Sequence, residues 1–332
     1  MLGTWRYLLA VVVALSHIEW RLAGLNPGVI AVVGFYLTSG YVMTGLLRSR
    51  YTTLADAPRF YLDRALRLLP QYFAIALLTL AWLLASGAAP DFLRDKPDWQ
   101  GLLNNLAIVP LNYYAFNGAD RFTLIPPAWS LGAEIQFYFF LPLILRLRAV
   151  VSVISVTIYV CAAAGIFNSD LFGFRLLPGV LWFFLLGSWL YDSHHGATPE
   201  RTGRRIALVM GAVALLWLAL WSYGKLALPY NRETLLGVLL ALPAVHLLAR
   251  RPRRTWDENL GNLSYGLFLN HFLIVWAVFD SSVHGFWPVL AFVLVATLGA
   301  GLSQGLVERP ALAWRKGLRA MSAGRSLKGA GR

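Results

Sequence analysis

Apolar residues fill long stretches of this chain, and short segments rich in polar residues, glycine and proline interrupt them at intervals. A helix needs about 20 apolar residues to cross the roughly 30 Å hydrocarbon core of a bilayer. Stretches of about this length recur near residues 7–23, 28–47, 69–86, 130–145, 150–167, 173–191, 206–223, 233–249, 262–279 and 287–307. The pattern predicts an all-α polytopic membrane protein with about ten transmembrane helices in one bundle.

The longest interruption of the apolar pattern runs over residues 87–129. A connection of that length usually carries function or structure of its own. Within it, "LLNNLAIVPLNYY" is apolar but broken by proline and asparagine, which predicts a short helix that lies at the membrane surface or dips into it. No repeat or linker divides the chain, so we expect one membrane domain, residues 1–310, followed by a basic cytoplasmic tail, residues 311–332.

The composition excludes an ordinary soluble domain, because 58% of the residues are hydrophobic and only 14% are charged. The formal net charge is +13, and in a membrane protein the position of the cations matters more than their total. With the N-terminus in the cytoplasm, 22 of the 29 lysine and arginine residues fall on the cytoplasmic side. This asymmetry predicts that both termini are cytoplasmic, that residues 87–129 lie outside, and that nucleic acid is not a partner.

Two polar residues share one face of the first apolar stretch. Arg6 and His17 are 11 positions apart, which on an α-helix brings the second to within roughly 20° of the first. Charged groups near a bilayer centre are costly, so such a stripe usually faces protein or a water-filled cavity. Arg6 and His17 are therefore candidate functional residues.

A second pair of arginines stands at the start of the third apolar stretch, in "FYLDRALRLLPQYF". Arg64 and Arg67 are three positions apart and share a helix face, and guanidinium groups suit phosphate oxygens. The same spacing also fits ordinary positive-inside topology.

Further polar residues interrupt two of the later apolar stretches. Glu134 and Tyr138 lie one helical turn apart in "PPAWSLGAEIQFYFFLP", and Ser264 and His271 lie two turns apart in "LGNLSYGLFLNHFLI". They are either functional groups or hydrogen-bonding residues that only hold helices together. Cys161 is the single cysteine and the remaining histidines form no metal-ligand set, so no metal is expected.

Six segments together resemble, in order and spacing, the acyltransferase-3 family of multipass bacterial membrane O-acyltransferases. They are the Arg6–His17 spacing, "LTSGYVM" with Ser39, "RALRLLP", "WSLGAEIQFY" with Trp129 and Ser130, "LGNLSYGLFLNH" and "VERP". Three positions depart from the family pattern, where acidic residues are common: Gly3, Val33 and Ile135. The missing acids leave Arg6 and His17 with fewer partners, which makes Glu134 the expected orienting carboxylate.

The resemblance implies transfer of an acyl group, often acetyl, from cytoplasmic acyl-coenzyme A to a hydroxyl on a glycan or other envelope molecule across the bacterial inner membrane. On this hypothesis Arg64 and Arg67 bind the coenzyme phosphates, Arg6 supports the coenzyme or an internal polar network, His17 acts on the transferring group, and Glu134 orients it or the acceptor. The substrate would be lined by Ser39, Trp129, Ser130, Tyr138, Ser264 and His271. Glycan-assembly proteins are possible partners, and the competing hypothesis is a transporter or flippase for an anionic or glycolipid solute.

Overall fold

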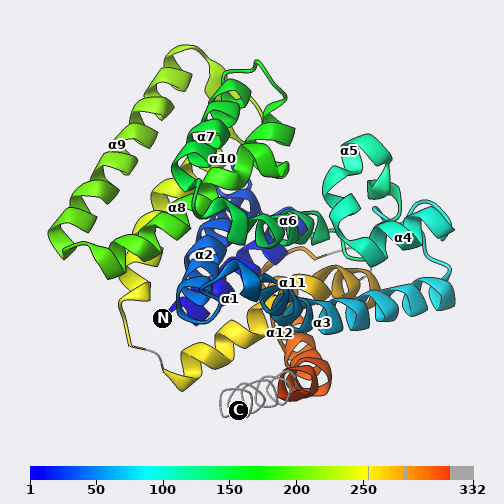
Figure 1. Ribbon diagram of the computed structural model, residues 1–332. Coiled ribbons are helices and arrows are strands. Elements are labelled where there is room, and N and C mark those ends of the chain that lie inside the picture. Colours follow the sequence, from blue (N-terminus) through cyan, green and yellow to red (C-terminus); the bar gives the residue numbers. More distant parts are fainter. Residues whose placement is uncertain (253, 280–282, 315–332) are drawn as a thin grey trace, which may run out of the picture.

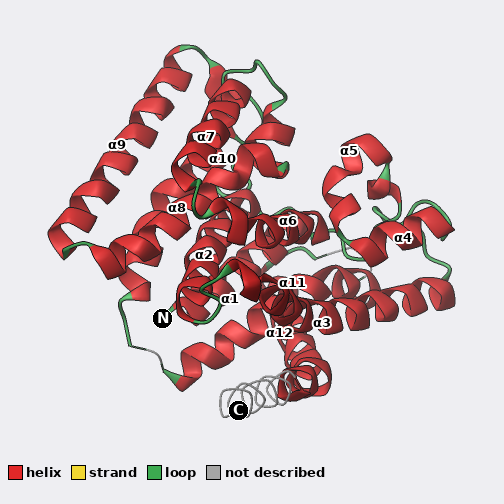
Figure 2. Cartoon of the chain, in the orientation of Figure 1, coloured by secondary structure: helices red, strands yellow, loops and turns green. Residues whose placement is uncertain are grey.

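The structure is a computed structural model that describes residues 1–252, 254–279 and 283–314. Within these ranges the chain forms α-helices joined by loops and by short 3₁₀ and π segments, with no strand (Figure 2). The predicted all-α class is therefore confirmed. The prediction of a basic tail falls mainly on residues 315–332, which lie outside the described residues.

Helix α2 (Pro27–Ser49) lies at the centre of the fold (Figure 1). It packs against α1 (Leu2–His17), α8 (Leu177–Gly196) and α10 (Asn231–Ala249), and α1 packs in turn against α11 (Thr255–Val278). The other long helices surround this group: α3 (Ala57–Ser86), α6 (Ala128–Ile144), α7 (Arg148–Ala163), α9 (Pro199–Ser222) and α12 (Phe286–Ser303).

Two glycines allow α2 and α8 to cross at close range. A Cβ atom at Gly40 would lie 1.8 Å from the carbonyl oxygen of Phe184, and one at Gly187 would lie 1.9 Å from that of Leu37. Small residues at such contacts let two helix backbones approach closely in a membrane bundle. The glycine of "LTSGYVM" is therefore required for packing, and it fixes the position of its neighbour Ser39.

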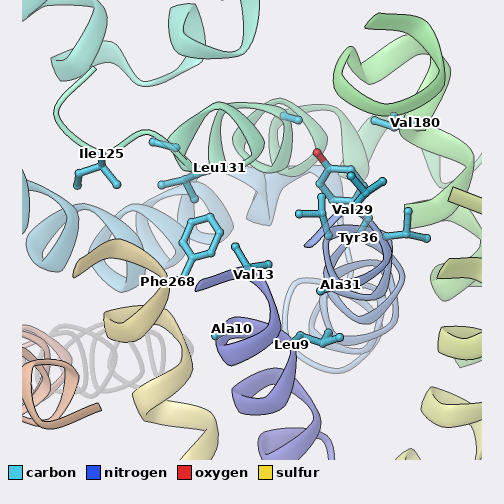
Figure 3. Close-up of a cluster of buried hydrophobic side chains, with 14 of the residues drawn as sticks. Leu9, Ala10, Val13, Val29, Ala31, Tyr36, Ile125, Leu131, Val180 and Phe268 are labelled. Carbon is cyan, nitrogen blue, oxygen red and sulfur yellow. The ribbon is translucent and has the colours of Figure 1, made fainter. Parts of the chain in front are cut away.

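Buried apolar side chains from several helices form one cluster near this crossing (Figure 3). Among them are Leu9, Ala10 and Val13 of α1, Val29 and Tyr36 of α2, Leu131 of α6, Val180 of α8 and Phe268 of α11. The outward faces of the peripheral helices are also apolar, as at Leu84 of α3, Leu215 of α9 and Leu298 of α12, each about two-thirds exposed. Such faces suit a lipid environment, in which helices satisfy their own backbone hydrogen bonds.

The prediction of about ten transmembrane helices is not confirmed. In the described part of the chain, six helical segments are long and apolar enough to cross a membrane: Pro27–Ser49, Leu54–Ser86, Leu171–Gly196, Pro199–Ser222, Asn231–Ala249 and Phe286–Trp314. Helices α1, α6 and α7 are apolar but have only 16 or 17 residues. Helix α11 has 24 residues, but polar positions such as Asn270 and His271 lower its hydropathy.

The long interruption forms a separate layer of short helices beside α3 (Figure 1). The predicted short helix is confirmed as α4 (Trp99–Ala107), which is followed by a 3₁₀ segment, Val109–Tyr113, and by α5 (Tyr114–Asn117). Asp98 begins α4 by accepting a hydrogen bond of 2.6 Å from the amide of Gly101. This layer leads directly into α6, whose first turn carries Trp129 and Ser130.

Candidate active site

Two adjoining cavities lie among the helices. The first, called here the arginine cavity, has a volume of about 150 Å³ and the second, the histidine cavity, about 250 Å³. Val32, Ser130 and Phe268 line both, so the two cavities meet at these side chains. Helix α1 contributes Arg6 to the first cavity and His17 to the second. The polar stripe expected on this helix therefore faces cavities inside the protein.

The start of α1 is fixed by a carboxylate on α11. Asp257 accepts hydrogen bonds from the backbone amides of Gly3 and Thr4 at 3.2 and 2.8 Å, and one from the Thr4 hydroxyl at 2.7 Å. These amides lack partners within their own helix, and a negative charge is favourable at a helix N-terminus. A Cβ at Gly3 would lie 1.8 Å from the Asp257 carbonyl oxygen, so the missing acidic residue at position 3 has a steric explanation.

The two arginines of α3 line the arginine cavity, each with a carboxylate partner. Arg64 pairs with Asp63 and also lies 3.6 Å from the sulfur of Met43, while Arg67 pairs with Glu308. All four charged side chains of these pairs are largely buried, and the two carboxylates are only 3% exposed. The positive charges of these two arginines are thus balanced by carboxylates, and Arg6, which lines the same cavity, adds a further cation.

Glu134, which lines the arginine cavity, is held by two hydroxyl groups. Ser39 of α2 donates a hydrogen bond of 2.6 Å to it, and Tyr138, one turn along α6, donates a second. The two hydroxyl oxygens are themselves 3.2 Å apart. The cluster joins α2 to α6, and it brings together three of the predicted site residues.

His17 and His271 form a hydrogen-bonded pair at the histidine cavity. Nδ1 of His17 lies 3.0 Å from Nε2 of His271, whose own Nδ1 lies 3.1 Å from the carbonyl oxygen of Leu267. A carbonyl oxygen can only accept, so His271 carries its proton on Nδ1 and its Nε2 accepts. His17 must then donate from Nδ1, which assigns the lone pair of the neutral ring to its Nε2.

The two imidazole rings of this pair differ in how accessible they are from the histidine cavity. His17 is the last residue of α1 and is exposed to the space of the histidine cavity, whereas His271 is fully buried. The Nε2 lone pair of His17 is thus the available basic nitrogen, and His271 supports it from behind. His271 was predicted as a lining residue, but its side chain lines neither cavity.

The other predicted lining residues are divided between the two cavities. Trp129 lines the histidine cavity, Ser264 lines the arginine cavity, and Ser130 lies where they meet. The hydroxyl groups of Ser130 and Ser264 each donate to a backbone carbonyl three residues earlier in their helices, at 3.0 and 2.7 Å.

Sequence reasoning missed several charged residues of this region. Asp63 and Glu308 are the partners of the paired arginines, and Asp120 and Arg175 line the histidine cavity. Glu308 could have been noticed as the acid of the "VERP" motif, which the family resemblance includes. Arg175 carried no signal beyond its aromatic neighbours in "LFGFR".

Arg175 is held in an aromatic box. Its guanidinium carbon lies 4.8 Å from the ring centre of Trp129, 5.2 Å from Tyr114, 5.5 Å from Phe174 and 5.7 Å from Tyr230. Its Nε donates a hydrogen bond of 2.6 Å to Asp170. Cation–π contacts and this ion pair fix the position of the guanidinium at the wall of the cavity.

No group of three or more His, Cys, Asp or Glu side chains that could hold a metal ion is found among the described residues. The expectation that no metal takes part stays a prediction.

Comparison with known proteins identifies the family. The family model described as "Acyltransferase domain", that of acyltransferase-3, matches residues 4–303. An uncharacterized protein of Aquifex aeolicus is 43% identical over 161 residues, which cover 46% of this chain and 71% of that protein. Nodulation protein 10 of Rhizobium leguminosarum is 25% identical over 318 residues, covering 86% of this chain and 82% of that one.

A protein of Staphylococcus aureus that is provisionally named an O-acetyltransferase is 25% identical over 350 aligned positions. The alignment covers 88% of this chain but 55% of that longer protein. No solved structure gives a significant match. Because the family model covers nearly the whole chain, and the helices with it, this protein belongs to the acyltransferase-3 family of membrane-embedded acyltransferases.

Proposed function

We propose that the protein transfers an acyl group, most simply acetyl, from acyl-coenzyme A to a hydroxyl of an envelope or exported glycan across the bacterial inner membrane. The observation that carries this proposal is the meeting of a cavity lined by arginines with a cavity lined by His17, at Ser130. A donor and an acceptor that enter from opposite ends would bring their reacting atoms together at that point.

The arginine cavity is the proposed donor site. Arg64 and Arg67 line this cavity, and their planar guanidinium groups suit the phosphate oxygens of the coenzyme. The thioester arm would then extend past the Ser39–Glu134–Tyr138 cluster toward Ser130. Arg6 and Glu134, which carry opposite charges, line the same cavity. The positive-inside asymmetry of the sequence supports a cytoplasmic donor side.

His17 is the proposed general base. The acceptor hydroxyl gives its proton to Nε2 of His17 while its oxygen attacks the thioester carbonyl carbon. The carbon–sulfur bond then breaks, and the leaving thiolate takes the proton from His17, so the histidine is regenerated. His271 holds the reactive tautomer by accepting the hydrogen bond from Nδ1. The lesser alternative is that Nε2 attacks first and forms an acyl-histidine.

The histidine cavity is the proposed acceptor site, with Arg175 as its anchor. The guanidinium is fixed in its aromatic box, and within the described residues its hydrogen bond to Asp170 is the only one that its side chain makes. Its remaining N–H groups suit an oxygen of the acceptor next to the reacting hydroxyl. Neighbouring oxygens of this kind are typical of a sugar ring.

The purified protein in detergent, mixed with acetyl-coenzyme A and candidate glycans, tests the proposal. We expect release of free thiol, read with a thiol reagent, together with an acetyl mass increase on one of the glycans. A transporter needs a sealed compartment and would release no thiol in detergent, so the absence of both signals with folded protein would contradict the proposal.

A further inference from the structure

A groove of about 770 Å³, lined by other residues than the two cavities, lies between α7, α8 and α9. Figure 1 shows α9 as the outermost helix on this side. Most of the lining is apolar, with Val156 and Val160 of α7, Leu185 and Leu186 of α8, and Val213 and Leu216 of α9. Neither the family match nor the proposed reaction assigns a role to it.

Arginines gather at one end of this groove. Arg146 and Arg148 line it where α7 begins, and no other charged residue in the described part of the chain lines it. Arg148 donates to Asp192 at 2.6 Å and to Ser188 at 3.2 Å, and Asp192 also pairs with Arg48 at 3.0 Å. Two arginines thus share one carboxylate, and Arg146, which is exposed, adds a further positive charge.

The groove also has the length of a lipid chain. From Arg148 at the start of α7 to Val160 is 12 residues, or roughly 18 Å at 1.5 Å per residue. Half of the bilayer core is about 15 Å, so a groove of this length accommodates one acyl chain of a single leaflet. Basic pockets between transmembrane helices bind the headgroups of anionic lipids.

We propose that this groove is a binding site for one anionic phospholipid, whose phosphate is bound by Arg146 and Arg148 and whose acyl chain lies along α7. The excess of positive charge at one end selects an anionic headgroup over a zwitterionic one. The apolar remainder of the groove holds the acyl chain of the lipid. The acyl chain there contacts both α9 and the neighbouring helices of the bundle. This site is independent of acyl transfer, so it stands or falls separately from the proposed function.

Lipid titration of the purified full chain tests the site. Phosphatidylglycerol or phosphatidylcholine is added to the protein in detergent, and bound lipid is counted by native mass spectrometry. We expect one tightly bound phosphatidylglycerol, and we expect Arg146→Gln to weaken it about fivefold, the effect of one cation near a lipid headgroup, without changing phosphatidylcholine binding. Arg59→Gln is the matched control, because Arg59 is exposed and lies on α3 outside the groove.

A second variant tests the chain-binding part of the groove. Ala212 of α9 lines it, so Ala212→Trp fills the space without altering charge and is expected to displace the bound lipid. Equal binding of both lipids by the parental protein, an Arg146→Gln affinity equal to that of the Arg59→Gln control, or unchanged binding by Ala212→Trp would each overturn the proposal. A dimer that excludes lipid from this face would overturn it as well.

Discussion

At the scale of single residues, two histidines from helices far apart in the sequence act as one unit. The carbonyl of Leu267 sets the proton of His271, and His271 in turn sets the proton of His17. Helical spacing predicted that each residue would face the interior. It could not predict their pairing, because they are 254 positions apart and periodicity along one helix does not tell which other helix it meets.

Substitution of His271 tests this chain of hydrogen bonds. The side-chain oxygen of a glutamine can still accept the proton on Nδ1 of His17, whereas a leucine cannot. We expect His271→Leu to lower kcat for acyl transfer at least tenfold, and His271→Gln to retain much more of it, with little change in KM for either substrate. Steady-state kinetics on folded variants measure the difference. Equal rates for the two variants would show that His271 only fills space.

At the scale of helices, apolar periodicity located most elements but not their ends. The first apolar stretch was predicted over residues 7–23, whereas α1 begins at Leu2 and ends at His17. Features outside the apolar pattern set where helices begin: Asp257 binds the free amides at the start of α1, and Asn26 caps the start of α2 by accepting a hydrogen bond of 3.0 Å from the Gly28 amide. The first depends on a tertiary contact and the second on a short turn, and a hydropathy pattern shows neither.

The α2–α8 crossing provides a test of packing. In Gly40→Ala the new methyl group would meet the backbone of Phe184, which cannot move without displacing α8. We expect a loss of more than about 2 kcal/mol of stability, as for other overpacked sites, with a lower Tm in detergent and a lower yield. Gly211→Ala on α9 is the control, because its Cβ would meet nothing within 4 Å. That change should leave Tm unchanged or raise it slightly. Equal Tm values for the two variants would contradict the close approach of α2 and α8 at Gly40.

The link between α3 and the segment after α12 depends on Arg67 and Glu308. Removing one partner of a buried ion pair costs about 3–5 kcal/mol, because the other charge is left without its counter-ion. We therefore expect Glu308→Leu to lower Tm strongly, and Arg67→Met with Glu308→Leu to recover part of the loss. Isothermal titration should still show weaker coenzyme A binding in the double variant, since the proposed phosphate-binding group is gone. If the single Glu308→Leu variant were as stable as the parental protein, the stabilising role of the Arg67–Glu308 ion pair would be contradicted.

At the scale of the whole molecule, the two adjoining cavities extend along the axis of α1, from Arg6 near its start to His17 at its end. At 1.5 Å per residue, the 11 residues between them span roughly 16 Å, about half of the hydrocarbon thickness. This separation follows from the 11-residue spacing in the sequence alone. The meeting of the cavities at Ser130 required the structure, because it depends on how α6 and α11 pack against α2.

The charge asymmetry predicts the topology of the chain. The topology determines which cavity faces the cytoplasm and which faces the outside. Cysteines introduced into a Cys161→Ser background should be labelled from the outside at residues 90–125 and protected at residues 50–65 and 195–205. Labelling of intact cells with a membrane-impermeant maleimide measures this. Protection of residues 90–125 together with labelling of residues 195–205 would reverse the proposed donor and acceptor sides.

The most direct test of His17 as the proposed general base is the rate of acyl transfer by His17→Ala. We expect this variant to keep its expression, its Tm and its affinity for coenzyme A, since His17 lies outside the arginine cavity. Its rate of acyl transfer should fall about a hundredfold or more, because the hydroxyl loses its base. The control is His284→Ala, which removes an exposed histidine that lines neither cavity and should transfer at the parental rate. A folded His17→Ala protein that transfers acyl groups at near the parental rate would contradict the mechanism proposed for this site.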